Sequence, residues 1–186
     1  MLHSLQGGEV EINIANKVTM ARIALIPVFL VVLYIGFPNN NYIAMGIFIL
    51  AGLTDIADGY IARKRGEVTD FGKFIDPLAD KVLVVSAMLW YIERGMMPAW
   101  AALIVIIREF MVQALRLIAV TNGRVIAAEV SGKIKTIVTM ICLSVMFLHL
   151  EQWMISICII AIIVTTVFSG IEYFVRNRDT LNWNTY

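Results

Sequence analysis

Residues 54–81 read TDIADGYIARKRGEVTDFGKFIDPLADK, in which four of the five aspartates interrupt two apolar segments on either side of a basic centre. The four are Asp55, Asp58, Asp76 and Asp80. The first two are three positions apart and the last two are four apart, so each pair projects from one face of its own helix. The short connector at residues 64–71 makes the two helices antiparallel neighbours. This stretch therefore predicts a helical hairpin that carries two carboxylates on each arm.

The two pairs of aspartates are predicted to meet at the same depth. Asp55 lies eight residues before Arg63, and Asp80 lies eight residues after Gly72. At a rise of 1.5 Å per residue, both aspartates lie about 12 Å from the connector. Four carboxylates that converge in poorly solvated surroundings repel one another and cannot all stay ionised unless positive charge joins them.

Divalent cations would supply that positive charge. Ligation by oxygen alone favours Mg²⁺ or Mn²⁺ over zinc, and magnesium sites commonly leave coordination positions for substrate phosphates. Two such ions, about 3.5 to 4 Å apart, can neutralise a diphosphate and stabilise the leaving oxygen during displacement at phosphorus. We therefore expect a site for two ions, Mg²⁺ (or Mn²⁺), held by the four aspartates.

The whole chain has the composition of an integral membrane protein. Of its 186 residues, 60% are hydrophobic and only 16% are charged, which lies outside the range of soluble domains. A helix that crosses a membrane needs roughly 20 mostly apolar residues, and six stretches meet this requirement. They are residues 18–35, 42–62, 72–92, 98–120, 133–148 and 153–175. We expect an all-α protein with six transmembrane helices, in which residues 16–178 form one domain between an N-terminal extension (1–15) and a C-terminal tail (179–186).

The positions of Lys and Arg predict the orientation in the membrane. Lys17 and Arg22 lie beside the first stretch. Further cations lie around the connectors that follow the second and fourth stretches and after the sixth, whereas the other connectors hold only Arg94. Because such cations are retained on the cytoplasmic side, both termini and the aspartate hairpin should face the cytoplasm. Trp90, Trp100 and Trp153 fall near the opposite ends of their stretches, as the residues of an aromatic belt do. The absence of an Arg-rich and Ser-rich transit segment favours a bacterial cytoplasmic (inner) membrane.

Charge and cysteine content exclude other classes of protein. Fifteen Lys and Arg against fourteen Asp and Glu give a net charge of +1, which offers no basic surface for nucleic acid. Cys142 and Cys158 lack the paired spacing of a zinc site or of a secreted disulfide framework.

The aspartate stretch resembles the signature of the CDP-alcohol phosphatidyltransferase family at every fixed position. These positions are Asp55, Asp58, Gly59, Ala62, Arg63, Gly72, Asp76 and Asp80. The resemblance implies a six-span enzyme that transfers a phosphatidyl or related group from a CDP-linked donor to an alcohol and releases CMP. It also implies that Asp55, Asp58 and Asp76 chiefly hold the metal ions, and that Asp80 contributes to metal binding and is the catalytic base.

The pocket for the CDP part of the donor has candidates of two kinds. The resemblance implies that Asp58, Gly59, Ala62 and Arg63 line it. Gly72 would let a ligand approach closely, although packing of small residues between helices is a competing explanation for both glycines. Asn16 and Thr19 lie near the cytoplasmic start of the first stretch and are further candidates, although helix capping explains them equally well.

Further motifs resemble family members that use CDP-diacylglycerol and glycerol 3-phosphate and that form homodimers among membrane lipids. These motifs are residues 13–22, 76–81, 108–110 with Arg116, 132–136 and 169–173. The phosphate of that acceptor needs cations, and the candidates are Arg108, Arg116, Lys133 and Lys135. The two arginines differ by about 80° around a helix, so both can face one cavity. The two lysines differ by about 200°, so only one of them should point inward.

Several alternatives stay open at this point. Arg108 and its neighbour Glu109 are also consistent with a buried ion pair that fixes helix packing. Another acceptor, such as inositol phosphate or serine, would suit the same chemistry. A divalent-cation transporter would also place carboxylates in the membrane. However, transporters often contain inverted repeats, and the fourth to sixth stretches do not repeat the aspartate arrangement of the second and third.

Overall fold

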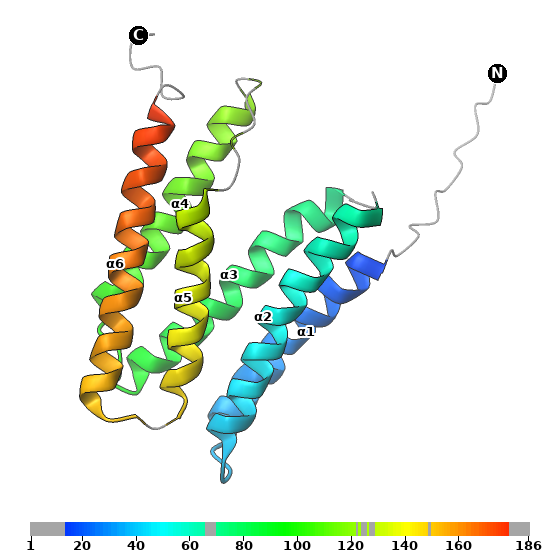
Figure 1. The fold of residues 1–186 in the computed structure, drawn as a ribbon. Coiled ribbons are helices and arrows are strands. Elements are labelled where there is room, and N and C mark those ends of the chain that lie inside the picture. Colours follow the sequence, from blue (N-terminus) through cyan, green and yellow to red (C-terminus); the bar gives the residue numbers. More distant parts are fainter. Residues whose placement is uncertain are drawn as a thin grey trace, which may run out of the picture.

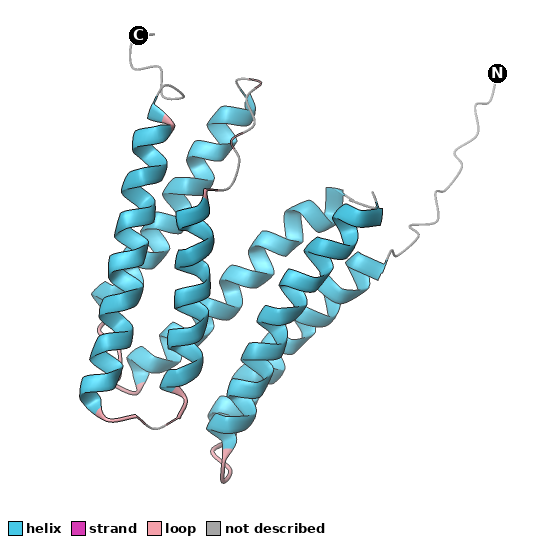
Figure 2. Cartoon of the chain, in the orientation of Figure 1, coloured by secondary structure: helices cyan, strands magenta, loops and turns pink. Residues whose placement is uncertain are grey.

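The helices of the structure coincide with the six apolar stretches. The computed structural model describes the backbone of residues 14–65, 70–121, 123, 126, 129–148 and 150–178; within its helices, the side chains of residues 14–19, 55–65, 70–78 and 80 fall outside the description. The helices are α1 (Ile14–Ile35), α2 (Asn40–Arg65), α3 (Asp70–Glu93), α4 (Ala99–Thr121), α5 (Val130–Met146) and α6 (Gln152–Arg176). The described part of the chain contains no strand (Figure 2). The predicted all-α class and the six helices are thus confirmed.

Successive helices alternate in direction (Figure 1). One end of the molecule, here called the terminal end, contains the start of α1, the end of α6 and the helix ends next to the α2–α3 and α4–α5 connections. The distal end contains the connections α1–α2, α3–α4 and α5–α6. α1, α2 and α3 contact one another, as do α4 and α6 and α5 and α6, while α3 also contacts α4 and α5. α2 also contacts α5, so α3 and α2 join the two groups of helices.

Glycines end helices at the distal end because the chain must reverse there within a few residues. Gly36 and Gly95 have φ values of 71° and 69°, in the left-handed region that residues with a side chain seldom adopt. After α3, the N–H of Gly95 donates to the carbonyl of Ile92 and the N–H of Met96 to that of Tyr91, which is the Schellman pattern of a helix end. The turn formers of the sequence thus lie where the chain turns.

A large apolar core occupies the distal half and includes residues from all six helices. At its centre, aromatic rings from α1, α2, α3 and the residue that follows α5 pack with centroids 5.1 to 6.1 Å apart. They belong to Phe29, Phe48, Trp90, Tyr91 and Phe147. The buried hydroxyl of Tyr91 donates to the carbonyl of Leu143 at 2.7 Å and so ties α3 to α5. A smaller cluster of Val112, Leu115 and Tyr173 joins α4 to α6 toward the terminal end.

One tryptophan departs from the aromatic belt that the sequence predicts. Trp100 and Trp153 are 57% and 64% exposed, as belt residues should be, whereas Trp90 is only 4% exposed. Ala87 and Leu83, one and two turns earlier in α3, are also buried, so Trp90 continues the inward face of that helix. The belt prediction is wrong for Trp90. Its place in the helical repeat turns the side chain toward the core, even though it lies near a helix end.

By length and composition, α6 is long and apolar enough to cross a membrane, and it is the one such helix among the described residues. Shorter apolar helical stretches are found at Met20–Ile35 and Asn40–Thr54. α4 has 23 residues but carries Arg108, Glu109 and Arg116, and α5 has only 17 residues.

Candidate active site

The four aspartates lie on two helices that run antiparallel and contact each other. Asp55 and Asp58 belong to α2, and Asp76 and Asp80 belong to α3. Asp55 lies ten residues before the end of α2 and Asp80 ten residues after the start of α3, so both lie about 15 Å along their helices from the connection. The predicted hairpin is present. The side chains of these residues fall outside the description, so their convergence on two metal ions stays a prediction.

Next to the aspartate hairpin, charged side chains from three helices form a cluster that we call the cationic layer: Lys81, Arg108, Glu109 and Lys135. Oε1 of Glu109 accepts hydrogen bonds from Nη1 of Arg108 at 2.9 Å and from Nζ of Lys135 at 2.8 Å. Nζ of Lys81 lies 3.5 Å from Oε2 of the same carboxylate. Lys81 directly follows Asp80 in the chain, so the layer adjoins the segment that carries the predicted base.

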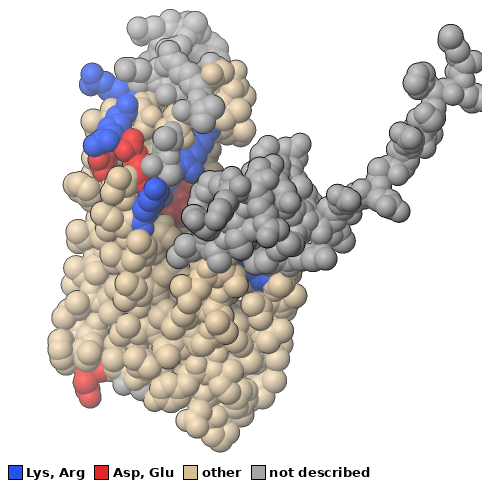
Figure 3. All heavy atoms as spheres, turned by 45° about the vertical axis from the view of Figure 1, so that its right-hand side comes forward, with Lys and Arg blue, Asp and Glu red and all other residues tan. Residues whose placement is uncertain are grey.

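The layer lies between the two apolar clusters because polar residues interrupt the inward face of each helix. In α4, Val105 and Val112 are buried in different clusters, with Arg108 and Glu109 between them. In α5 and α6 the same depth contains buried polar side chains; these are Lys135, Thr139, Thr166 and Ser169. In Figure 3 the visible charged side chains gather toward the terminal end, while the distal half is almost uniformly uncharged.

The structure distinguishes the two candidate lysines of α5. Lys135 is 4% exposed and is bound to Glu109, whereas Lys133 is exposed. This agrees with the expectation that one of them points inward. A buried ammonium group is costly unless it is paired, so its contact with Glu109 explains how Lys135 is tolerated in the interior.

Arg116 lies two turns beyond Arg108, toward the terminal end. Its Nε donates to the hydroxyl of Tyr173 at 3.0 Å, and its guanidinium carbon lies 5.6 Å from the centroid of the same ring. Arg108 and Arg116 are thus oriented by different partners, Glu109 on their own helix and Tyr173 on α6.

Two glycines leave room for Arg108. A Cβ at Gly132 of α5 would lie 3.4 Å from Nη2 of Arg108, and one at Gly170 of α6 would lie 3.2 Å from its Cγ. Nε of Arg108 and Oγ of Ser131 are buried and have no hydrogen-bond partner among the described residues. Buried polar groups normally have hydrogen-bond partners. The unpartnered N–H of Arg108 and hydroxyl of Ser131 therefore favour a ligand with acceptor oxygens.

Sequence reasoning missed three features of this region. It treated Glu109 only as a possible packing partner of Arg108, and it gave no role to Tyr173, although both lie inside motifs that it quoted. It assigned Arg22 to membrane orientation, yet Arg22 is 1% exposed and thus faces the interior. All three residues lie within the quoted motifs, and this was the feature of the sequence that could have indicated their roles.

The residues of the predicted donor pocket all have side chains that fall outside the description. Asn16 and Thr19 lie in the first two turns of α1. Gly59, Ala62 and Arg63 lie in the last two turns of α2, and Gly72 lies in the first turn of α3. These backbone positions all lie toward the terminal end (Figure 1).

A family model described as CDP-alcohol phosphatidyltransferase matches residues 12–168. The chain belongs to the CDP-alcohol phosphatidyltransferase family. The match spans the aspartate hairpin, the cationic layer and most of α6, so it covers every predicted site residue. The chain is therefore an enzyme, a phosphatidyltransferase, rather than a transporter.

Curated relatives extend this similarity over most of the chain. A Bacillus subtilis (strain 168) protein named CDP-diacylglycerol–glycerol-3-phosphate 3-phosphatidyltransferase is 40% identical over 91% of this chain and 97% of its own length. A Mycobacterium tuberculosis protein named probable phosphatidylglycerophosphate synthase is 36% identical over 88% of this chain and 81% of its own length. A Wigglesworthia glossinidia brevipalpis protein with the same name as the first is 32% identical over 88% of this chain and 93% of its own length.

Proposed function

We propose that this enzyme transfers a phosphatidyl group from CDP-diacylglycerol to glycerol 3-phosphate, giving phosphatidylglycerophosphate and CMP for phospholipid biosynthesis. The names and full-length similarity of the curated relatives support both substrates. The observation in the structure that carries the proposal is the partly buried cationic layer beside the aspartate hairpin.

The chemistry of the layer favours an acceptor that carries a phosphate. Arg108 and Lys135 share one carboxylate oxygen of Glu109, and Lys81 lies near the other oxygen, so one negative charge serves three cations. Arg116 adds a guanidinium group, whose planar fork binds phosphate oxygens in a bidentate way. Serine has no phosphate to meet these cations, and its own ammonium group would be repelled by them. Glycerol 3-phosphate therefore fits the layer better than serine does.

The proposed reaction is a displacement at phosphorus. Asp80 accepts the proton of the acceptor hydroxyl, whose oxygen forms a bond to the phosphorus that bears diacylglycerol. The bond from that phosphorus to the CMP oxygen breaks, and CMP leaves with the electron pair. Arg108, Arg116 and Lys135 hold the acceptor phosphate, so that the hydroxyl is oriented before the attack.

The donor set of the hairpin fits hard divalent cations, since it consists of carboxylates alone. Asp55, Asp58, Asp76 and Asp80 would hold two Mg²⁺ (or Mn²⁺) ions. When bound, these ions would supply the positive charge that a diphosphate leaving group needs.

We place all six helices across a bacterial cytoplasmic membrane, with both termini and the active site on the cytoplasmic side. The alternating helix directions, an even number of helices and the charged terminal end support this orientation (Figures 1 and 3). The charged groups of α4 turn toward the other helices, which suits a membrane helix whose ionised residues must avoid lipid. On the family resemblance we also propose a homodimer, which light scattering of the purified protein would test.

Release of CMP from CDP-diacylglycerol tests the reaction. Purified protein should release CMP with Mg²⁺ and glycerol 3-phosphate, and much less when inositol phosphate or serine replaces the acceptor. Product identification should give phosphatidylglycerophosphate, and EDTA should stop the release until Mg²⁺ is restored. Absence of release with glycerol 3-phosphate would reject the acceptor, and release unaffected by EDTA would reject the metal ions.

A further inference from the structure

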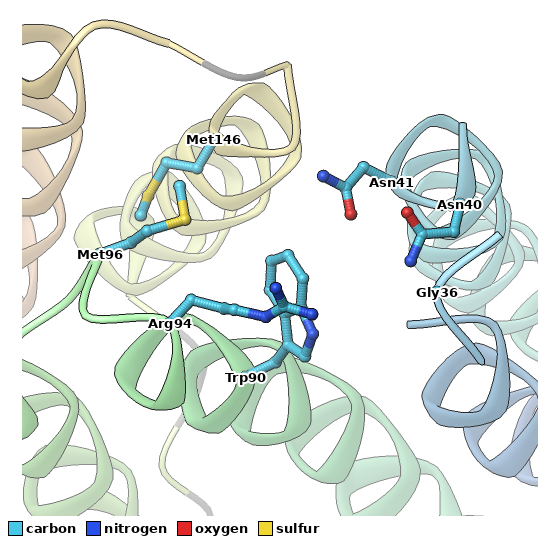
Figure 4. A pocket seen from close by; sticks show the side chains of 7 residues that line it. All are labelled: Gly36, Asn40, Asn41, Trp90, Arg94, Met96 and Met146. Atoms are coloured by element: carbon cyan, nitrogen blue, oxygen red, sulfur yellow. The ribbon is translucent and has the colours of Figure 1, made fainter. Parts of the chain in front are cut away.

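A second site candidate lies at the distal end, away from the aspartate hairpin. It is a cavity of about 430 Å³ between the α1–α2 turn, the end of α3 and the end of α5. It is lined by Gly36, Asn40, Asn41, Trp90, Arg94, Met96 and Met146. Figure 4 shows Arg94 and Trp90 stacked together, with the two asparagines on one side of them and the two methionines on the other.

The cavity is rich in hydrogen-bond donors. The guanidinium carbon of Arg94 lies 5.2 Å from the centroid of the Trp90 ring. This cation–π contact holds the positive charge of Arg94 beside the buried indole. Trp90 is 4% exposed, and its buried Nε1 has no hydrogen-bond partner among the described residues. An indole N–H can only donate, so a ligand that satisfies it must bring an acceptor.

No carboxylate is among the described residues that line this cavity. Glu93, which precedes Arg94, accepts a hydrogen bond from the hydroxyl of Tyr34 on α1 instead. The amide nitrogen of Asn40, at the start of α2, donates to the carbonyls of Val32 and Leu33, which holds this side chain against the end of α1. The described lining therefore combines one cation, one unsatisfied donor and the side chains of two asparagines, and includes no acidic residue.

We infer that this distal cavity binds a phosphate group, through Arg94 and the indole N–H of Trp90. Phosphate oxygens accept hydrogen bonds and carry negative charge, so they can form charge-assisted hydrogen bonds with Arg94. The volume is that of a small-molecule site, and the thioether side chains of Met96 and Met146 offer an apolar wall beside the polar one. The phosphate could belong to a phospholipid headgroup or to a soluble anion. The inference does not depend on the transfer reaction, because none of its residues belongs to the aspartate hairpin or the cationic layer.

The fluorescence of Trp90 provides a direct test. The full chain with Trp100→Phe, Trp153→Phe and Trp183→Phe retains Trp90 as its sole tryptophan. In detergent, this protein is titrated with inorganic phosphate, with short-chain phosphatidylglycerol and with diacylglycerol of the same chain length. We expect a saturable change in Trp90 emission with at least one of the two phosphate compounds and none with diacylglycerol. A response to phosphatidylglycerol alone assigns the site to a lipid headgroup, and a response to inorganic phosphate assigns it to the phosphate group itself.

Variants of Arg94 test whether the change in Trp90 emission comes from binding in the cavity. Arg94→Gln should raise the half-saturating concentration about tenfold, whereas Arg94→Lys, which keeps the charge, should raise it by about threefold or less. Arg94 is exposed, so neither change should unfold the protein, and the melting temperature checks this. Arg176→Gln, which removes an exposed charge at the terminal end, is the matched control and should leave the response unchanged. A lack of response to both phosphate compounds, or an equal response in Arg94→Gln, would overturn the inference.

Discussion

At the scale of single residues, Glu109 organises the cationic layer. One carboxylate is shared by cations from three helices, so it orients groups that would otherwise repel one another. The interpretation of Arg108 and Glu109 as a packing ion pair and the interpretation of Arg108 as a phosphate ligand are therefore compatible. Nη1 faces the carboxylate, while Nε is buried without a partner among the described residues.

The two lysines of α5 allow a matched comparison. Lys135→Ala removes a buried ammonium group that donates to Glu109, whereas Lys133→Ala removes an exposed one. We expect Lys135→Ala to raise the KM for glycerol 3-phosphate about tenfold and to lower the melting temperature, because a charge-assisted hydrogen bond is lost. Lys133→Ala should change both by little. Steady-state kinetics and thermal melting are the measurements, and equal effects of the two changes would contradict the assignment of Lys135.

The hydroxyl of Tyr173 is predicted to position Arg116. Tyr173→Phe removes the acceptor of the Arg116 Nε hydrogen bond but keeps the ring beneath the guanidinium group. The KM for glycerol 3-phosphate should rise about fivefold while kcat stays within about twofold, since a hydrogen bond to a charged group is lost outside the reacting atoms. Tyr34→Phe at the distal end serves as the control. A fall in kcat with KM unchanged would argue against a positioning role.

Asp80 carries the proposed proton transfer. Asp80→Asn keeps the size of the side chain but removes its basicity, so turnover should be abolished while binding of CDP-diacylglycerol is largely preserved. CMP release and equilibrium binding of the donor are measured on the same preparation. Substantial remaining turnover would remove Asp80 from the role of base.

At the scale of helices, the position of Arg108 depends on the packing of α4 against α6 and on the reach of its side chain to α5. Gly132 and Gly170 face this side chain, and both lie within motifs of the sequence. Their small size is explained here by the approach of a charged side chain rather than by contact between helix backbones.

Gly170→Ala tests this explanation. A methyl group 3.2 Å from Cγ of Arg108 forces the side chain to shift by a few tenths of an ångström. We expect the KM for glycerol 3-phosphate to rise about threefold, because small displacements of positioning groups are costly. Gly46→Ala in α2 is the matched control, since a Cβ there meets nothing within 4 Å. Kinetics of the two variants at equal expression are compared, and identical values would show that Arg108 does not need this space.

At the scale of the whole molecule, the two halves differ in construction. The distal half is held by one apolar core with residues from all six helices, and the smaller cluster of the terminal half joins α4 to α6. The cationic layer lies between the two clusters, where charged groups interrupt the apolar packing. The apolar packing of the distal half therefore holds the six helices together beneath the end at which we place the active site.

The orientation of the whole molecule can be measured with single cysteines. Cys142→Ser and Cys158→Ser provide a cysteine-free background, to which either Glu151→Cys at the distal end or Arg178→Cys at the terminal end is added. In sealed right-side-out vesicles, a membrane-impermeant maleimide should label Glu151→Cys from outside and Arg178→Cys only after permeabilisation. The reverse pattern, or labelling of both from outside, would contradict the proposed orientation.

The number, extent and type of the helices followed from the sequence, because long apolar stretches bounded by turn residues leave few alternatives. Each of the six predicted stretches overlaps a helix closely, and the aspartate signature indicated the family. Trp90 and Arg22 were misjudged for one reason. Their position near a helix end suggested an interface role, whereas burial depends on which neighbouring helices cover that face.

The sequence by itself determined the helical hairpin, the carboxylates on each of its arms and the reaction class they resemble, since these depend on spacing along one or two helices. Only the tertiary structure decided that Lys135 rather than Lys133 faces inward, that Glu109 gathers cations from α3, α4 and α5, and that Trp90 and Arg94 line a cavity at the far end. The physical reason is that these contacts join residues distant in sequence, and they form only when packing of the apolar faces sets the rotation and depth of each helix.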